Sequence, residues 1–508
     1  MAANTQEIER KYEAPPNTPM PDLTCVPRVA AQTTASEDSL DAVYYDTAVF
    51  DLLRAGITLR QRKGGSDAGW HLKVPGQERD VRAELRLPDA EQLPEEFAGL
   101  LTARVRGRDL QPVAQITTTR RRSLLKGEDD HALAEVALDA VTAKSFGPDS
   151  ALTRWNELEI ELAEGVAKGR SLFKAVDRQL RHEGIRRSSR ATKLHTALAY
   201  SLDAVGTRTA AGPKLTHDAT AAPLLAYLRE QLEELTSWDL AVRRDEFDSV
   251  HKMRVAVRRM RAALQTYRPL LQAENAQHLI SELRWIGQEL GNARDEEVIA
   301  KRLSARVSEV PTDLVLGPVA ARVEGHYAPR QAATRRALLE ALHSERYVAL
   351  LRSLEAFLAN PPLTPDEDAP DVPTLVRRAH RRVRRRMHSA LQEAPGPQRD
   401  AALHEVRKAA KRARYAAEVA GLHYGKKARR SARGYKEVQS LLGDHHDAII
   451  GAGALRELAL RAYAEGENTF TYGLLHQRDL DEAARLALQV PRAWKRASRS
   501  KRTAWMKR

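Results

Sequence analysis

The sequence predicts an α+β protein of two parts: an N-terminal antiparallel β barrel or tunnel, followed by an all-α domain built from a duplicated helical bundle. Three patterns predict it. In the first 200 residues, apolar and polar residues alternate with period two in short segments. After residue 222, apolar residues recur every 3.6 positions, and a basic motif occurs twice in the helical part. At 508 residues the chain has room for roughly two to four ordinary domains.

The composition is that of a soluble chain. Hydrophobic residues make up 42% and charged residues 30%, while only 5% are aromatic, so a core of Leu, Ala and Val is expected. The single cysteine, Cys25, excludes an internal disulfide framework and a thiolate zinc cluster. The N-terminus lacks an apolar segment, and no run approaches the roughly 20 apolar residues of a membrane span. We therefore expect a cytoplasmic protein without membrane contact.

The net charge of +14 is unevenly distributed. Residues 1–200 carry 29 Lys and Arg against 30 Asp and Glu, whereas residues 201–508 carry 53 against 38, a net charge of +15. A basic half indicates an anionic partner such as nucleic acid, an anionic membrane surface or polyphosphate. A merely solubilising surface is the alternative, and the arrangement of the charges has to decide between them.

The first part, expected over residues 1–203, contains short alternating segments separated by Gly and Pro. Antiparallel strands of a sheet or barrel show this pattern. The predicted strands are 57–62, 70–74, 81–87, 134–139 and 157–162, and a helix is predicted over 169–183. A stretch rich in Gly, Thr, Ala and Pro then predicts a linker over 204–221.

The second part, expected over 222–495, has helical periodicity. Five prolines in fourteen residues break it at 360–373 and separate repeats of about 222–359 and 374–495. The predicted helices are 224–267 (one helix or two), 275–290, 295–307, 319–342, 347–358, 374–391, 399–424 and 428–442. Residues 492–508 hold eight Lys and Arg and no acid, so a mobile basic tail is expected, with 496–508 as its own segment.

The helical part carries an internal duplication. One copy reads HKMRVAVRRMR from His251, and the other reads HEVRKAAKRAR from His404. About forty residues later, ELGNARDEEV matches LLGDHHDAII. The second copy has Lys411 where the first has Arg258, which is a mild change. Two such units are expected to pack as pseudo-symmetric bundles that bring their matching helices together.

Both copies place basic residues on one stripe of a helix, at offsets 0, 3, 7 and 10 from the histidine. Neighbouring like charges repel by a few tenths of a kcal/mol per pair, so a single stripe indicates acidic partners or a solvated face. Two duplicated stripes in a basic half favour polyanion binding. Few aromatic residues lie nearby, which favours a polymer without bases over nucleic acid. The candidates are His251, Arg254, Arg258, Arg259, Arg261, His404, Arg407, Lys408, Lys411, Arg412 and Arg414.

Charged residues also alternate along the predicted strands. Carboxylates alternate with apolar residues in 157–162, while Glu7, Glu9 and Lys11 share one face near the N-terminus. Solvent-facing strands would explain isolated cases, but several strands with charges of both signs suggest a charged barrel lumen. Carboxylates bind Mg²⁺ or Mn²⁺, and Arg and Lys neutralise phosphate oxygens. Together they describe metal-assisted phosphoryl transfer.

These motifs carry a resemblance to known families. EIERK, YYDT, LRQRK, HLKVP, VRAEL, AEVALD and ELEIEL make residues 1–203 similar to the CYTH family, the triphosphate tunnel metalloenzymes. The duplicated HxxRxxxRRxR and LGxxxD elements make residues 220–495 similar to CHAD, a helical domain named for its histidines. The resemblance implies a two-domain CYTH–CHAD protein whose eight-stranded tunnel binds linear triphosphates with a divalent metal, and whose helical domain binds polyphosphate.

The resemblance also implies roles for residues at matching motif positions. The expected metal ligands, for Mg²⁺ or Mn²⁺, are Glu7, Glu9, Glu159 and Glu161. The expected catalytic residues are Lys11, Arg60, Arg62, Lys73 and Glu84. The expected substrate-binding residues are Arg82, Arg120, Arg122 and Lys193, with Glu135 and Asp139 on further tunnel strands.

The function expected from all this is a metal-dependent triphosphatase acting on inorganic triphosphate, with a basic helical domain that binds inorganic polyphosphate. A non-catalytic polyphosphate-binding or targeting protein is the alternative, and adenylate cyclase and thiamine triphosphatase rank below it. The full set of tunnel carboxylates favours hydrolysis, because simple anion binding does not need them. Association with cytoplasmic polyphosphate granules would follow, and no protein partner is predicted.

Overall fold

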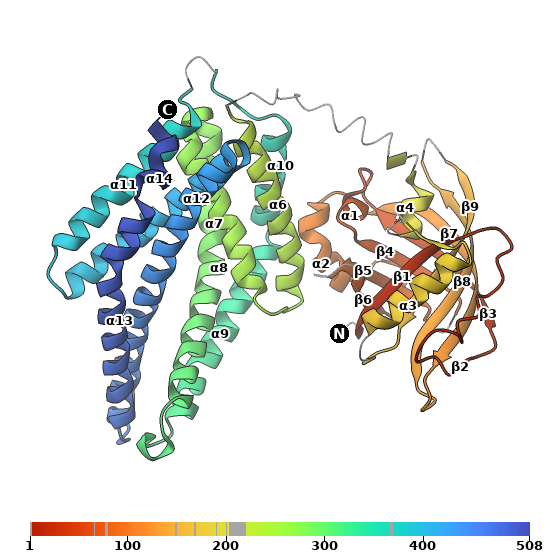
Figure 1. Ribbon diagram of the computed structural model, residues 1–508, viewed down its shortest axis with the longest axis horizontal. Helices are drawn as coiled ribbons and strands as arrows, with labels where there is room; N and C mark the ends of the chain where they lie inside the picture. Colours follow the sequence, from red (N-terminus) through yellow and green to blue (C-terminus); the bar gives the residue numbers. More distant parts are fainter. Residues whose placement is uncertain are drawn as a thin grey trace. The chain divides into compact units, whose positions relative to one another are not determined.

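The computed structural model describes residues 3–65, 67–76, 80–147, 150–166, 169–188, 190, 192–199, 201–202, 220–365 and 369–507. The chain divides into two compact units, Met1–Ala211 and Gly212–Arg508 (Figure 1). Most of the linker expected over 204–221 lies outside the described residues. Within them, no helix is long and apolar enough to cross a membrane.

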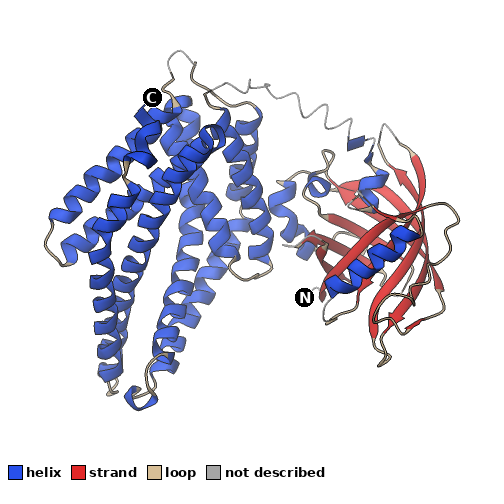
Figure 2. Cartoon of the chain, viewed as in Figure 1, coloured by secondary structure: helices blue, strands red, loops and turns tan. Residues whose placement is uncertain are grey.

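The first unit is a closed antiparallel barrel, which confirms the predicted fold class (Figure 2). Its eight strands follow the order β1-β6-β5-β4-β3-β7-β8-β9, and pairing of β9 with β1 closes the wall. They are β1 (Ala3–Ala14), β3 (Ser36–Asp46), β4 (Thr58–Lys63), β5 (Gly69–Pro75), β6 (Val81–Leu87), β7 (Gln111–Lys126), β8 (Ala132–Ser145) and β9 (Leu152–Leu162). The two-residue strands β2 (Ala31–Gln32) and β10 (Arg186–Arg187) pair with β7 and β1.

Alternation along the strands decides which side chains face the lumen. On β9, Leu158 and Ile160 are fully buried in an apolar cluster with Phe173 and Val176 of α3 (Gly169–His182). This helix therefore covers the outside of the wall, and the glutamates between these apolar residues must point inward. The other helices of the unit are short: α1 (Asp51–Arg54), α2 (Glu95–Val105) and α4 (Lys193–Ala197).

The second unit is all helical where it is described, apart from one isolated bridge (Figure 2). Its long helices are α6 (Ala222–Arg243), α7 (Ser249–Tyr267), α8 (Ala273–Ser308), α9 (Val319–His343), α10 (Glu345–Ala359), α11 (Val372–Gln392), α12 (Pro397–Ala464) and α13 (Phe470–Ala497). The helices predicted over 275–290 and 295–307 form the continuous α8, since no Gly–Pro break separates them. In α12 the predicted interruption is confined to Gly425, whose φ is 56°.

The duplicated basic segments lie on α7 and α12, and these two helices are in contact. The Arg258 Nε–H donates to the Tyr415 hydroxyl at 2.9 Å, and the Tyr267 hydroxyl donates to the Ala416 carbonyl at 2.7 Å. Tyr267 and Tyr415 are both almost fully buried. The duplication therefore brings its two matching helices together, as the repeat predicts.

The prediction of a mobile C-terminal tail is wrong for the described residues. Residues 492–497 are the last turns of α13, and α14 (Ser500–Thr503) and a 3₁₀ turn (Ala504–Lys507) follow. Trp505 is 8% exposed, and its indole N–H donates to Ser431 on α12 at 2.8 Å. Charge alone suggested mobility, but the aromatic residue in this segment anchors it.

Candidate functional site

All thirteen residues predicted for the tunnel lie around its lumen. They line two adjoining cavities of about 390 and 70 Å³ that share Arg60, Arg62, Lys73, Arg120 and Glu161. Cations and carboxylates from all eight strands, and from α4, thus converge on one passage. The wider cavity adds Glu7, Glu84, Arg122 and Glu135, and the narrower one adds Glu9, Lys11, Arg82, Glu159 and Lys193.

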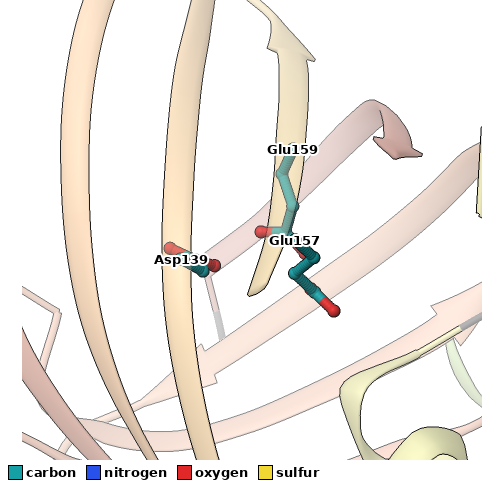
Figure 3. Close-up of side chains that lie close together, drawn as sticks. All are labelled: Asp139, Glu157 and Glu159. Carbon is teal, nitrogen blue, oxygen red and sulfur yellow. The ribbon is translucent and has the colours of Figure 1, made fainter. Parts of the chain in front are cut away.

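A buried group of three carboxylates lies beside the narrower cavity. Oxygens of Asp139, Glu157 and Glu159 lie within 4.8 Å of one another (Figure 3). Asp139 on β8 is the registered partner of Glu157 on β9, which explains why the group forms. Such a cluster has the chemistry to hold a divalent cation.

An internal lysine already compensates part of the charge of this group. The Lys193 Nζ lies 2.8 Å from Asp139, 2.6 Å from Glu157 and 2.8 Å from Glu159. Although burial opposes ionisation, Lys11, Lys193 and Arg120 hold the pKa of Glu159 well below its usual range. The carboxylate predicted as a metal ligand is thus committed to three cationic side chains. Asp139 and Glu157 were not among the predicted ligands.

The other three predicted metal ligands face a different environment. Glu7 accepts from the Lys73 ammonium at 2.6 Å, and Glu9 lies 3.6 Å from the Lys11 ammonium. Glu161, paired in register with Glu9, makes no ion pair with the described residues. Burial and the carboxylates of Glu7 and Glu9 raise the pKa of Glu161 to about 7. Negative charge therefore remains uncompensated at this point of the lumen.

The predicted phosphate-binding cations are held by acids. Arg60 lies 3.3 Å from Glu84, Arg62 lies 2.6 Å from Asp67, and Arg122 lies 2.5 Å from Asp38. These ion pairs orient guanidinium groups around the passage before any anion enters. The entering phosphate oxygens would exchange with the carboxylates rather than meet bare cations.

Glu84 is fully buried at the centre of these pairs. It accepts from His71 at 3.0 Å, and Lys73 and Arg86 also contact it. Burial raises the pKa of Glu84, but Lys73, His71 and Arg60 together hold this pKa far below its usual range. An acid that stays ionised in this way fits a positioning role for the surrounding cations better than proton transfer.

Several lumen residues were missed by the sequence analysis. His71 and Asp67 hold Glu84 and Arg62, and Tyr44 accepts from Arg60 at 3.2 Å. Arg86 lies two positions after Glu84 on β6, so period-two alternation could have found it. Asp67 lies between strands, where no periodic signal exists.

The helical unit contains a second charged site. A cavity of about 850 Å³ is lined by nine of the eleven residues predicted for polyphosphate: His251, Arg254, Arg258, Arg261, His404, Arg407, Lys408, Lys411 and Arg412. Arg259 and Arg414 are not among its lining residues. They lie 3.5 and 2.7 Å from Glu418, which Tyr227 also contacts. Arg414 holds a stripe position and Arg259 the position next to one, but Glu418 holds both side chains outside the cavity.

Positive charge in the helical cavity is only partly compensated. Arg254 lies 2.7 Å from Asp295, yet Lys411 makes no ion pair with the described residues. Burial, with Arg258 and Arg407 nearby, lowers the pKa of Lys411 to about 7. Burial and the cations around it likewise lower the pKa of His446 to about 4. The cavity is therefore built to receive negative charge.

The repeated glycines have a structural role here. A Cβ atom at Gly291 would meet the Arg254 guanidinium at 3.4 Å, and one at Gly443 would meet that of Arg407 at 3.4 Å. The glycine in each copy lets the arginine of the same copy lie flat against the neighbouring helix. The sequence shows this motif twice but does not reveal its purpose.

Comparison with known proteins supports both assignments. The CYTH domain model matches residues 5–195, and the CHAD domain model matches residues 226–456. The chain is 36% identical over 517 residues to "Uncharacterized protein MT2285" of Mycobacterium tuberculosis (strain CDC 1551 / Oshkosh), covering 98% of this chain and 97% of that protein.

Two solved structures resemble about half of the chain. PptA from Streptomyces chartreusis is 21% identical with a TM-score of 0.44, covering 54% of this chain and 98% of its own. The CHAD domain from the plant Ricinus communis is 27% identical with a TM-score of 0.42, covering 54% and 91%. The matches to the two family models and to the full-length relative show that this chain belongs to a family of two-domain proteins in which a CYTH domain precedes a CHAD domain.

Proposed function

We propose that the tunnel hydrolyses inorganic triphosphate, or a related linear triphosphate, with Mg²⁺ or Mn²⁺, and that the helical cavity binds inorganic polyphosphate. CYTH domains are metal-dependent, and many are triphosphatases or cyclases. The observation that carries the tunnel proposal is Glu161, which makes no ion pair with a described residue, whereas the other predicted metal ligands each do. Simple anion binding would not need it.

Two groups of carboxylates could hold a divalent metal, and among the described residues only Asp139, Glu157 and Glu159 have three oxygens within 4.8 Å of one another. We place the metal at the other group, Glu7, Glu9 and Glu161, whose oxygens would have to draw closer around it, because a cation there would offset the carboxylate repulsion that raises the pKa of Glu161. A metal held there would supply Lewis-acid chemistry, polarising a phosphate oxygen and making water a better nucleophile. Lys193 already compensates Asp139 and Glu157, so that group is the weaker metal candidate.

The chain's own cations bind and orient the substrate. Arg60, Arg62 and Arg120 line both tunnel cavities and can each bind phosphate oxygens with two N–H groups. Lys193, tied to three carboxylates, lines the narrower cavity and fixes cationic charge there. This arrangement suits a short linear anion with negative charge along its length.

Two alternatives are less well supported. A tunnel that only binds polyphosphate leaves Glu161 unexplained. For a cyclase, Tyr44 is the single aromatic side chain among the described residues that line the tunnel cavities. An adenine ring would therefore have little to stack on.

A substrate panel tests the proposal. Phosphate release from inorganic triphosphate, thiamine triphosphate, ATP and long polyphosphate is measured with Mg²⁺, with Mn²⁺ and with EDTA, and the products are identified. Metal-dependent release from inorganic triphosphate is expected. Formation of cyclic AMP from ATP would show that the tunnel is a cyclase and not a triphosphatase. Phosphate release that continues in EDTA would show that hydrolysis does not need a metal.

A further inference from the structure

A second basic cavity lies beside the first in the helical unit. It has a volume of about 490 Å³, a floor that includes Leu271 and Leu375, and arginines from three segments around it. They are Arg268 after α7, Arg378 and Arg382 on α11, and Arg412 on α12. No Asp or Glu is among the described lining residues, so its charge is uncompensated.

Helix α11 supplies two of the four arginines that line this cavity. Its residues 372–392 include seven arginines and no acid. Arg378 and Arg382 are exposed and, within the described ranges, make no ion pair with an acid. Burial, together with the charges of Arg382 and Arg386, lowers the pKa of Arg412. Repulsion therefore accumulates where an anion could relieve it.

The two cavities adjoin through shared residues. Arg412 and Gln265 line both, and the Arg412 Nη2–H donates to the Gln265 amide oxygen at 3.0 Å. A flexible chain of phosphates leaving the first cavity at Arg412 would next reach Arg378 and Arg382. No aromatic side chain lines the second cavity in the described part of the chain, so unstacked bases would find no platform there.

We propose that the second cavity is an extension subsite for linear inorganic polyphosphate, which makes binding dependent on chain length. Short chains fill the first cavity only, whereas long chains also reach Arg378 and Arg382. The inference rests on the proposed polyphosphate binding in the first cavity and adds a separate ligand-binding role for α11.

The test compares two double variants of the full-length protein. Arg378→Gln with Arg382→Gln removes two charges from the second cavity. Arg381→Gln with Arg384→Gln removes two exposed charges from the same helix that do not line it. Binding of size-fractionated short and long polyphosphate, and of an oligodeoxynucleotide of matched charge, is measured by titration, and circular dichroism checks the fold.

The cavity variant should bind long polyphosphate about tenfold more weakly, as loss of two charge-assisted contacts predicts, and short polyphosphate unchanged. The control variant should change neither by more than about twofold. If both double variants lose the same affinity for long polyphosphate, the total positive charge of α11 governs binding, and the proposed subsite is overturned. If the wild-type protein binds the oligonucleotide more tightly than long polyphosphate, and the cavity variant weakens oligonucleotide binding by the same factor, the second cavity is a nucleic-acid site and the proposal is overturned.

A further variant separates failure of this inference from failure of the proposed function. The double variant Arg254→Ala with Arg407→Ala should weaken the binding of short and of long polyphosphate by the same factor. If it does, while the α11 variant matches its control, the first cavity stands and the extension is overturned. If the wild-type protein binds neither length, both proposals are overturned.

Discussion

The tunnel and the helical cavity both present arginines and lysines to an anion, but they compensate this charge differently. In the tunnel, Arg62 and Lys73 face Asp67 and Glu7 at 2.6 Å, and Lys193 touches three carboxylates. In the helical cavity, Lys411 faces Arg258 and Arg407, and its pKa falls to about 7. One site is nearly balanced, and the other is cationic.

This difference in charge compensation suits the tunnel to catalysis and the helical cavity to anion binding. A balanced site does not hold anions by net charge, so it needs an added cation to bind and activate a triphosphate. An unbalanced cationic site binds any flexible polyanion of suitable width, and its affinity follows salt and pH.

The largest effect is expected at Glu161. Glu161→Gln should lower metal-dependent phosphate release from inorganic triphosphate by about 100-fold or more, because it removes the free carboxylate that a divalent cation needs. Glu183→Gln, in the turn that follows the outer helix α3, is the control and should leave the rate unchanged. A Glu161→Gln enzyme with full activity and unchanged metal dependence would place the metal elsewhere.

The next effect is expected in the helical cavity. Replacing Arg254, Arg258, Arg407 and Lys411 together by Ala should weaken polyphosphate binding by at least about 100-fold. The slope of log affinity against log salt should become shallower by about 3, as expected for four lost phosphate contacts on a single strand.

A matched control for this variant removes four exposed basic residues of α12 that line neither helical cavity: Lys427, Arg430, Arg433 and Lys436. Its salt slope should stay near that of the wild type. If the two quadruple variants lose the same affinity, total charge rather than the cavity governs binding.

A pH effect is expected from Lys411. Its free-state pKa of about 7 must rise when an anion binds, so affinity is greatest below pH 7 and falls as pH rises above it. Between pH 6 and pH 8 the loss should approach tenfold, since one pH unit above the pKa costs about 1.4 kcal/mol. The charged groups facing Lys411 are Arg254 and Arg258 on α7 and Arg407 and Asp447 on α12, and the titratable histidines near it are His404 and His446.

The first repeat supplies the control for this prediction, because it has Arg258 at the matching position. Lys411→Arg keeps a charge that does not titrate near neutral pH, so affinity for polyphosphate should become flat between pH 6 and pH 8. Titrations of both proteins at constant ionic strength check this. A wild-type affinity that is independent of pH, or a variant that keeps the full pH slope, would contradict it.

The smallest effect is expected at Gly443. A Cβ there would meet the Arg407 guanidinium at 3.4 Å, so Gly443→Ala should displace Arg407 slightly and weaken polyphosphate binding a few-fold. Gly453→Ala, in the same helix with nothing within 4 Å, should not weaken it. Each should raise the free energy of unfolding by up to about 1 kcal/mol, because Ala favours helix over Gly. Equal binding by both variants would contradict the proposed role of this glycine.

Much of the fold could be predicted because it depends on periodicity. The β6 strand, Val81–Leu87, has the bounds that alternation predicts, and α3 ends one residue early. Alternation also predicted the charged lumen, since Leu158 and Ile160 fix which face of β9 points outward. The helix duplication predicted nine of the residues that line the helical cavity.

What could not be predicted depends on contacts between distant segments. The pairing of Asp139 with Glu157 across β8 and β9 needs the strand register. The capture of Arg259 by Glu418 needs the packing of α7 against α12. The anchoring of Trp505 on Ser431 joins residues 74 positions apart. Local pattern contains none of this information.

The contrast between the two sites is tested most directly by titrating Mg²⁺ into metal-free protein while phosphate release from triphosphate and binding of long polyphosphate are followed together. The account predicts that release is absent without metal and rises as the tunnel is loaded, while polyphosphate binding is already complete. Release that is unchanged by Mg²⁺, or polyphosphate binding that appears only with it, would contradict the account.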